Sequence, residues 1–269
     1  MAQMNAAWKA IPVVWLLMLF VVQANAQVPP GNGGLYRWDG NSFVEENGYG
    51  VRIAVAPNGE AWVVNAAGEI FRQVGKAFQK VDGSGRDIAV AGDGTPWVVG
   101  VDDRVYRLIR NNWEPVPDTA ASAIAAGRRD DVWVANARGE IYRWNGRGFQ
   151  VQPGGARDIG VAGNSVWLVG TDSSIYEVQR NGKIVDRRGM AARIAVAGSV
   201  PWVVTDKGDI YRWRGTSFEQ VPGSASDIGA NARGDVWVIG RVQGTSQTPA
   251  QPGRGRARGR AAHARSRRR

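Results

Sequence analysis

One tryptophan recurs along this chain at an almost constant interval, and this repeat limits the possible folds more than any other feature. Its six copies are separated by 35, 36, 34, 35 and 35 residues: Trp62, Trp97, Trp133, Trp167, Trp202 and Trp237. A fixed period of about 20 to 50 residues is typical of repeat architectures, in which each repeat is one small supersecondary unit. Residues 35–240 are therefore predicted to contain six copies of one structural unit.

A second landmark indicates how the two ends of the array are related. Eight residues after each of the first five tryptophans comes an aliphatic residue followed by an aromatic one: Ile70-Phe71, Val105-Tyr106, Ile141-Tyr142, Ile175-Tyr176 and Ile210-Tyr211. The sixth such pair is missing after Trp237 and is found near the N-terminus as Leu35-Tyr36. A repeat divided between the two ends of an array predicts a closed ring.

Each unit has the pattern of four short β-strands. Segments rich in Val, Ile, Trp, Tyr and Phe alternate with turn signals such as Asn58-Gly59 and Asp93-Gly94, without helix-length periodicity. We therefore predict an all-β fold, a six-bladed β-propeller of four-stranded antiparallel blades. N-terminal strands over 35–38 and 43–46 are expected to complete the last blade, which strands over 228–231 and 236–239 begin. This pairing would close the ring and remove exposed sheet edges.

The hairpins also predict which side chains face one another. Ala137-Arg138-Gly139 suits a three-residue hairpin turn, which places Trp133 opposite Arg143. The same offset pairs Trp62 with Arg72, Trp97 with Arg107, Trp202 with Arg212, and Trp237 with Arg37, whereas Trp167 meets Glu177. An indole–guanidinium contact is expected in these five repeats, each worth about 0.5–2 kcal/mol. Asp87, Asp158 and Asp227 precede the first strand of three units and are expected to accept hydrogen bonds that fix the connection between units.

The formal net charge of +10 lies at the ends of the chain. Residues 241–269 carry nine arginines and no acid, and Lys9 is the only charge in residues 1–26, which leaves 24 basic and 24 acidic residues between them. The basic character is therefore no sign of a nucleic-acid-binding body, and no sequence-specific nucleic-acid partner is expected. The Arg/Gly-rich tail is predicted to be disordered, either as a solubilising extension or as a tether to polyanions.

The N-terminus has the features of an export signal. Lys9 precedes the apolar run 11–22, and Ala24-Asn25-Ala26 fits the small-x-small rule of signal peptidase. A spanning helix needs about 20 apolar residues, so an uncleaved anchor is the weaker alternative. We predict a signal peptide over 1–26 cleaved after Ala26, a short lead over 27–34, and a secreted or periplasmic protein with no stable membrane span after processing.

Two residue types that many active sites require are almost absent. The chain has no Cys, and its single His, His263, lies in the tail. This excludes disulfides, thiolate metal sites, a cysteine nucleophile and a Ser-His-Asp triad within the repeats. The acidic pairs Asp102-Asp103 and Asp130-Asp131 lack the ligand density of a calcium loop and are interpreted as solvated turn residues. No catalytic residue, metal or cofactor is predicted.

Two strings in the middle of the chain resemble tectonin repeats. They are residues 157–169, Arg-Asp-Ile-Gly-Val-Ala followed by Val-Trp-Leu-Val, and residues 131–144, which contain Asp-Val-Trp-Val and Gly-Glu-Ile-Tyr-Arg-Trp. Such repeats build the tachylectin-1-like and fish-egg lectins and the fungal and bacterial tectonins, and the resemblance covers about residues 35–240. It implies binding of glycans, often microbial saccharide or lipopolysaccharide, without catalysis. The fourth repeat departs from the pattern, with Glu177 in place of Arg and no aromatic residue over 181–185.

Sugar sites combine an exposed aromatic face with hydrogen-bonding side chains. The six period-marking tryptophans occur in every unit and are interpreted as structural filling between blades. The indoles that occur in only some units are the candidate carbohydrate-binding residues, with packing against an outer strand as the alternative: Trp38, Trp144, Trp213 and Trp113.

Three classes of function remain open for such a chain. The first is an exported, non-catalytic, lectin-like propeller that binds glycans or glycolipids through several related sites, where multivalency raises avidity. The second is an extracytoplasmic scaffold that binds a protein partner on a propeller face without sugar. The third is an enzyme with its site over the central channel, which the missing His and Cys disfavour.

Overall fold

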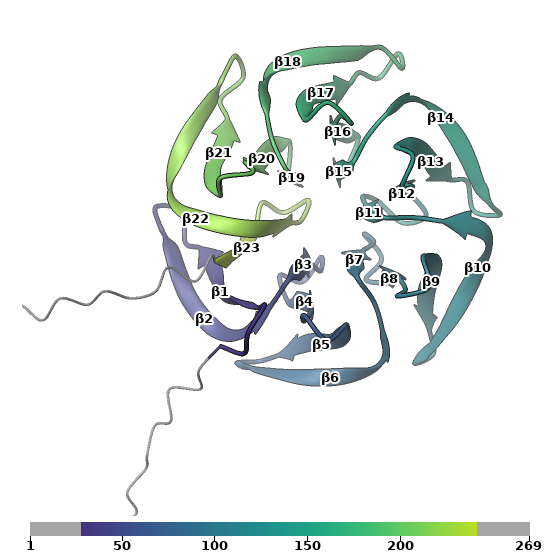
Figure 1. The fold of residues 1–269 in the computed structure, drawn as a ribbon, viewed down its shortest axis with the longest axis vertical. Helices are drawn as coiled ribbons and strands as arrows, with labels where there is room; N and C mark the ends of the chain where they lie inside the picture. The colour runs from purple at the N-terminus through teal and green to yellow at the C-terminus, as the bar shows by residue number, and fades with distance from the viewer. Residues whose placement is uncertain (1–27, 241–269) are drawn as a thin grey trace, which may run out of the picture.

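The computed structural model describes residues 28–240, which form 23 β-strands and no helix around a central axis (Figure 1). No segment of this described part could therefore cross a membrane as a long apolar helix. The sheets stand side by side like the blades of a propeller, with their first strands next to the axis (Figure 1). The protein is thus an all-β propeller of small antiparallel blades, as the repeat pattern predicts.

Four of the sheets are separate, antiparallel and four-stranded. The first contains β3 (Arg52–Val55), β4 (Ala61–Val64), β5 (Glu69–Val74) and β6 (Ala77–Ser84). The second contains β7 (Asp87–Val90), β8 (Pro96–Val99), β9 (Arg104–Ile109) and β10 (Asn112–Ala120). The third contains β11 (Ala123–Ala126), β12 (Val132–Ala135), β13 (Glu140–Trp144) and β14 (Phe149–Gly155). The fourth contains β15 (Asp158–Ala162), β16 (Ser165–Val169), β17 (Ser174–Val178) and β18 (Ile184–Met190).

The remaining strands form one seven-stranded sheet. In spatial order they are β19 (Arg193–Ala197), β20 (Val200–Val204), β21 (Asp209–Trp213), β22 (Phe218–Ala230), β23 (Val236–Gly240), β1 (Gly33–Trp38) and β2 (Phe43–Gly50). The long strand β22 joins two four-stranded groups, because its first half, 218–224, pairs with β21 and its second half, 225–230, pairs with β23. Here the structure differs from the expected run of short separate strands: β22 continues as one strand through the connection between two units.

The two ends of the described chain meet within this sheet. Strand β1 pairs with β23, with Leu35 opposite Ile239 and Arg37 opposite Trp237. The predicted pairing between the N-terminal strands and the last strand is therefore confirmed. This contact joins segments about 200 residues apart, so the sheet that contains it forms only when both ends are in place.

The core lies between neighbouring sheets. The six period-marking tryptophans are each no more than 5% exposed, which fits the structural role expected for them. Each packs with residues of an adjoining repeat, as where Trp133 shares a cluster with Ile159 and Leu168. Near the axis the buried residues are small, such as Ala89 and Ala195, because the first strands crowd together there.

The predicted strand registers are confirmed in every repeat. Trp133 lies opposite Arg143, and the same offset holds for the other four Trp–Arg pairs and for Trp167 with Glu177. The guanidinium carbon lies 5.2 to 5.9 Å from the facing indole in three of the five pairs, those of Arg72, Arg143 and Arg212. The expected contact is not found in the other two, where Arg37 and Arg107 form ion pairs with outer-strand glutamates instead.

The outer strand of each repeat contains a backbone irregularity that the sequence analysis missed. A residue with positive φ interrupts the pairing in all six: Gly48, Gly83, Asp118, Gly154, Gly189 and Gly223. Such bulges bend a strand and increase its twist, which lets the outer strand pass to the next repeat. The steps of 34 to 36 residues between these positions were a readable signal in the sequence.

Candidate functional site

The three repeat-specific tryptophans at the end of the third strand pack against the preceding repeat. Trp38 lies 5.3 Å from Trp202, Trp144 lies 5.6 Å from Trp97, and Trp213 lies 5.6 Å from Trp167, between ring centroids. Trp144 is buried, and Trp38 and Trp213 are half-buried. These indoles therefore lie in the packed boundary between repeats, with part of Trp38 and of Trp213 still accessible.

Trp113 lies in a different place, at the start of the outer strand β10. Its indole nitrogen donates a hydrogen bond of 2.6 Å to the carbonyl oxygen of Asp82 in the preceding repeat. Its ring lies against the bulge at Gly83, where an added Cβ would be only 2.6 Å from two indole atoms. Gly83 is therefore required for this ring position.

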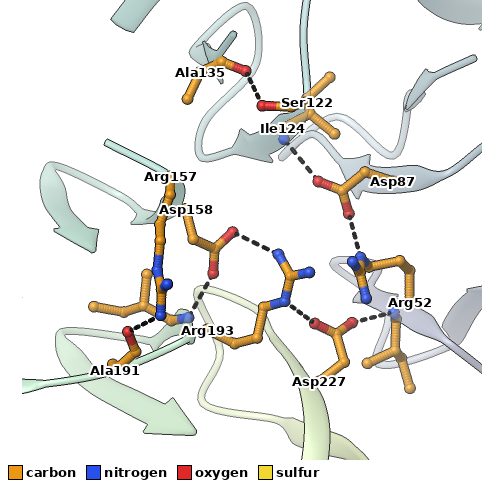
Figure 2. Close-up of polar contacts among 12 residues, drawn as sticks. Arg52, Asp87, Ser122, Ile124, Ala135, Arg157, Asp158, Ala191, Arg193 and Asp227 are labelled. Carbon is orange, nitrogen blue, oxygen red and sulfur yellow. Dashed lines mark hydrogen bonds and ion pairs between the residues drawn. The ribbon is translucent and has the colours of Figure 1, made fainter. Parts of the chain in front are cut away.

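The central channel carries a ring of charged residues at one level. Three buried carboxylates come from alternate repeats: Asp87 and Asp158 are the first residues of β7 and β15, and Asp227 has the equivalent position within β22. Each accepts a hydrogen bond from the backbone N–H of an isoleucine in the following repeat, at 2.7 to 2.9 Å (Figure 2). The expectation that these acids fix the connection between units is confirmed.

The intervening repeats contribute two cations and one small apolar residue to this ring. Arg52 pairs with Asp87 at 3.7 Å, and Arg193 lies between Asp158 and Asp227 at 3.7 and 3.5 Å (Figure 2). The third equivalent position is Ala123. Three carboxylates therefore face two guanidinium groups, and burial raises the pKa of Asp158 to about 7 and that of Asp227 to about 6.

The channel itself is too narrow for a sugar. The cavity along the first strands has a volume of about 60 Å³, far below the range of about 300–1,000 Å³ that ligand pockets commonly measure. Among residues 28–240 no group of three or more His, Cys, Asp or Glu side chains is placed to hold a metal ion. The charged ring is therefore a structural element of the channel.

The ring reveals that the six repeats are of two alternating types. At the end of the second strand, alternate repeats have Gly100, Gly170 and Gly240, at steps of 70 residues, where the others have Asn65, Asn136 and Thr205. In the glycine type, the ring of a tyrosine of the third strand lies close to this glycine. An added Cβ would be 2.4 Å from the Tyr36 ring at Gly240 and 2.7 Å from the Tyr176 ring at Gly170.

Two open cavities lie at boundaries that lead into a glycine-type repeat. One, of about 600 Å³, is lined by Tyr36, Phe43, Gly223, Ser224 and Gly240, among others. The other, of about 310 Å³, lies at the boundary between the third and fourth sheets. Its lining includes Tyr176, Ile184, Gly154, Gly155 and Gly170.

These two cavities are copies of one site. Tyr36 and Tyr176 belong to the same landmark pair of the repeat, and Gly240 and Gly170 both follow their tryptophan by three residues. Gly223 and Gly154 are the bulges of the preceding outer strands. The site was not predicted from the sequence, because its signal, the glycines at steps of 70 residues, recurs at twice the basic period and is not visible in a single repeat.

Polar groups surround the aromatic ring in each copy. The Tyr176 hydroxyl donates a hydrogen bond of 2.9 Å to Asp172, and the backbone N–H of Ser174 is the first of the hydrogen bonds that lower the pKa of that carboxyl. Burial raises the pKa of Tyr36, with a smaller effect from Glu45. Ser42 and Ser224 add hydroxyl groups to the larger cavity. Each cavity thus combines an aromatic surface with hydrogen-bonding groups around it.

One acid of the predicted solvated turns is placed differently from the expectation. Asp131 is buried, where it accepts hydrogen bonds from the indole nitrogen of Trp133 at 2.9 Å and from Arg143 at 2.7 Å. The aspartate therefore holds both members of a cation–π pair. Its neighbour Asp130 is exposed. The export signal, the cleavage position after Ala26 and the arginine tail lie outside the described residues.

Residues 49–121 match the model of the Tectonin domain, which confirms the resemblance to tectonin repeats for this stretch of the chain. No curated protein sequence matches the chain significantly.

Several solved propellers are similar in fold. They include the WD40 β-propeller domain of Doa1, at 11% identity with a TM-score of 0.57 over 77% of this chain and 83% of that one. U3-55K matches at 10% identity with a TM-score of 0.52 over 67% and 70% of the two chains. Human WBSCR16 matches at 11% identity with a TM-score of 0.51 over 68% and 70%. At these identities the likeness concerns the fold alone.

Proposed function

We propose that this chain is an exported, non-catalytic, lectin-like propeller that binds glycans in the cavities between its repeats. In this proposal the seven-stranded sheet is two blades that share β22, so that the ring has six closed blades. The observation that carries the proposal is the presence of two equivalent cavities, each built around a tyrosine that lies against a glycine of the neighbouring strand.

The chemistry of these cavities suits a saccharide. A sugar ring has a C–H face that packs on an aromatic side chain and a rim of hydroxyl groups that needs donors and acceptors. The larger cavity has the rings of Tyr36 and Phe43 together with the hydroxyls of Ser42 and Ser224. Ligand pockets commonly measure about 300–1,000 Å³, and both cavities lie within that range.

Repetition supports binding to a surface that carries many copies of the same glycan. Two sites on one rigid ring engage neighbouring copies simultaneously, and linking two such events raises avidity by about 10²–10⁴-fold without new contacts. Microbial saccharide or lipopolysaccharide, as the tectonin resemblance implies, is a ligand of this kind. Trp38 and Trp213, with their half-buried indoles, remain additional candidates for sugar contact beside the cavities, and Trp144 and Trp113 are weaker ones.

The arginine tail is proposed to add an electrostatic contact. Nine arginines without an acid attract phosphorylated glycolipids or acidic polysaccharides, and such binding weakens steeply with salt. Binding of the mature chain to heparin should therefore fall as salt rises from 50 to 500 mM, and removal of residues 241–269 should abolish it. Heparin binding that does not respond to salt would contradict a tether.

A glycan array with the mature chain tests the proposal. We expect binding that drops at least tenfold in Tyr36→Ala and in Tyr176→Ala. Tyr211→Ala is the matched control, because this ring has the same strand position in a repeat of the other type. Thermal unfolding curves would confirm that each variant is folded. A blank array for the folded wild type would reject sugar binding and favour the scaffold, in which a propeller face binds a protein partner.

A further inference from the structure

Because the two repeat types alternate, three of the boundaries between repeats are equivalent to one another. Two of these three boundaries hold the cavities described above. The third lies between the first and second sheets. Its residues correspond one by one to those around the cavity at Tyr176. The bulge is Gly83, the strand-end glycine is Gly100, and the tyrosine is Tyr106, whose ring would be 2.8 Å from a Cβ added at Gly100. Its hydroxyl donates a 2.7 Å hydrogen bond to Asp102, as that of Tyr176 does to Asp172.

One position distinguishes this boundary from the other two. It lies at or next to the start of the outer strand and pairs with a residue at the end of the third strand. The residue there is Phe43 at the boundary with Tyr36, Ile184 at the boundary with Tyr176, and Trp113 at the third boundary. Phe43 and Ile184 are part of the cavity walls. Trp113 has a larger ring, and its hydrogen bond to the Asp82 carbonyl holds that ring against Gly83.

The ring is also packed on its inner side. Trp113 belongs to the cluster that contains Tyr106, Leu108 and the buried residues Ile70 and Val98. These residues come from both sides of the boundary, from β5 on one side and from β8 and β9 on the other. The indole therefore spans the boundary at the level at which the other two boundaries have cavities.

We propose that Trp113 is a built-in plug: the chain contains three copies of one ligand cavity, and the indole of Trp113 fills the third. The fold thus offers three sites related by the double repeat, and two of them accept a ligand. The part of the inference that concerns ligand number rests on the proposed sugar binding, whereas the filling of the third cavity does not.

Two variants test the plug without any ligand. Crystal structures of Trp113→Ala and Trp113→Leu should show the bulge at Gly83 retained and an open cavity between Gly83 and Tyr106, comparable to the one of about 310 Å³ at Tyr176. Trp113→Leu keeps apolar contact with the cluster and serves if the alanine variant does not fold. A structure in which the outer strand collapses onto Tyr106 overturns the proposal, whatever the array shows.

The ligand number gives a second, separate readout. With the strongest glycan of the array as probe, native mass spectrometry should count two bound molecules on the wild-type chain and three on Trp113→Ala. The reverse change, Ile184→Trp, should plug the cavity at Tyr176 and leave one. A count of two on Trp113→Ala, with the cavity open in its crystal structure, would reject the third site. A blank array would reject the proposed function alone, since the crystal structures still decide on the plug.

Discussion

The carboxylate of Asp227 accepts a hydrogen bond of 2.9 Å from the backbone N–H of Ile53, which is 174 positions away in the chain. This bond joins the last inner strand to the first. It is the third of three equivalent bonds, after those from Asp87 to Ile124 and from Asp158 to Ile194. The last and first repeats are therefore joined near the axis by the same buried contact that joins two other pairs of neighbouring repeats, in addition to the pairing of β1 with β23.

Replacement of Asp227 should weaken the junction between the last and first repeats. Asp227→Ala removes the acceptor of a buried N–H and a partner of Arg193, and we expect the free energy of unfolding to fall by about 2–4 kcal/mol. Asp227→Asn keeps an acceptor oxygen and should cost less than half as much. Urea unfolding monitored by tryptophan fluorescence measures both. Equal losses in the two variants would show that the charge, and not the hydrogen bond, matters.

The stability of the protein should depend on pH in a direction set by the channel. Burial raises the pKa of Asp158 to about 7 and that of Asp227 to about 6, and it also raises the pKa of Asp87. These groups hold protons more tightly in the folded state, so their contribution is complete below about pH 4 and is lost as the pH rises through 6 to 7. Urea unfolding should give a free energy about 2–4 kcal/mol lower at pH 8 than at pH 5.

Glu140 affects the stability in the opposite direction, and at lower pH. Hydrogen bonds from Asn136, Arg138 and Tyr142 lower the pKa of Glu140 to about 2, so its contribution is present above about pH 4.5 and is lost as the pH falls through 2. Asp158→Asn removes a carboxyl whose pKa is raised, so its free energy of unfolding should vary less between pH 5 and pH 8 than that of the wild type. The loss of stability at acid pH, to which Glu140 contributes, should stay unchanged in this variant. A stability that rises from pH 5 to pH 8 in the wild type would contradict the assignment.

A cation at position 123 should complete the charge alternation of the channel. Ala123 is equivalent to Arg52 and Arg193 and lies between the repeats that carry Asp87 and Asp158. Ala123→Arg should lower the pKa of both carboxyls by nearby positive charge and raise the free energy of unfolding at pH 8 by about 1–2 kcal/mol. Ala123→Met controls for side-chain size. If the free energy of unfolding has the same pH dependence in both variants, the balance of charges in the channel does not determine how stability changes with pH.

The fold and the strand pairs could be predicted because the repeat supplies six independent copies of each signal. The offset from Trp133 to Arg143 follows from a single hairpin turn, and the split of Leu35-Tyr36 from the last repeat indicates where the ends meet. The continuity of β22 could not be predicted. Its connection, Pro222-Gly223-Ser224, has the composition of a turn, yet Gly223 forms a bulge within one strand.

The candidate site was harder to predict because it depends on contacts between repeats. The residues predicted from the sequence were the indoles found in only some repeats, Trp38, Trp144, Trp213 and Trp113. The cavities are instead formed by Tyr36 and Tyr176 against glycines. A tyrosine present in most repeats gives no sign of which copy lines a cavity. That depends on the residue at the start of the outer strand, Ile184 or Trp113, and on the glycine across the boundary, which are more than 25 positions apart in the chain.

The fourth repeat contains an exchange of charges that a double variant can reverse. Glu177 replaces the usual arginine opposite Trp167, and Arg187 on the outer strand forms an ion pair with it. The guanidinium carbon of Arg187 also lies 5.9 Å from the ring of Trp213.

Glu177→Arg alone places two cations together and should lower the free energy of unfolding by about 1–2 kcal/mol. Adding Arg187→Glu should recover at least half of that loss, because it recreates the diagonal arrangement of Arg37 and Glu46 on β1 and β2. Thermal and urea unfolding of both single variants and the double variant form a double-mutant cycle, and a coupling energy near zero would show that the two side chains act independently.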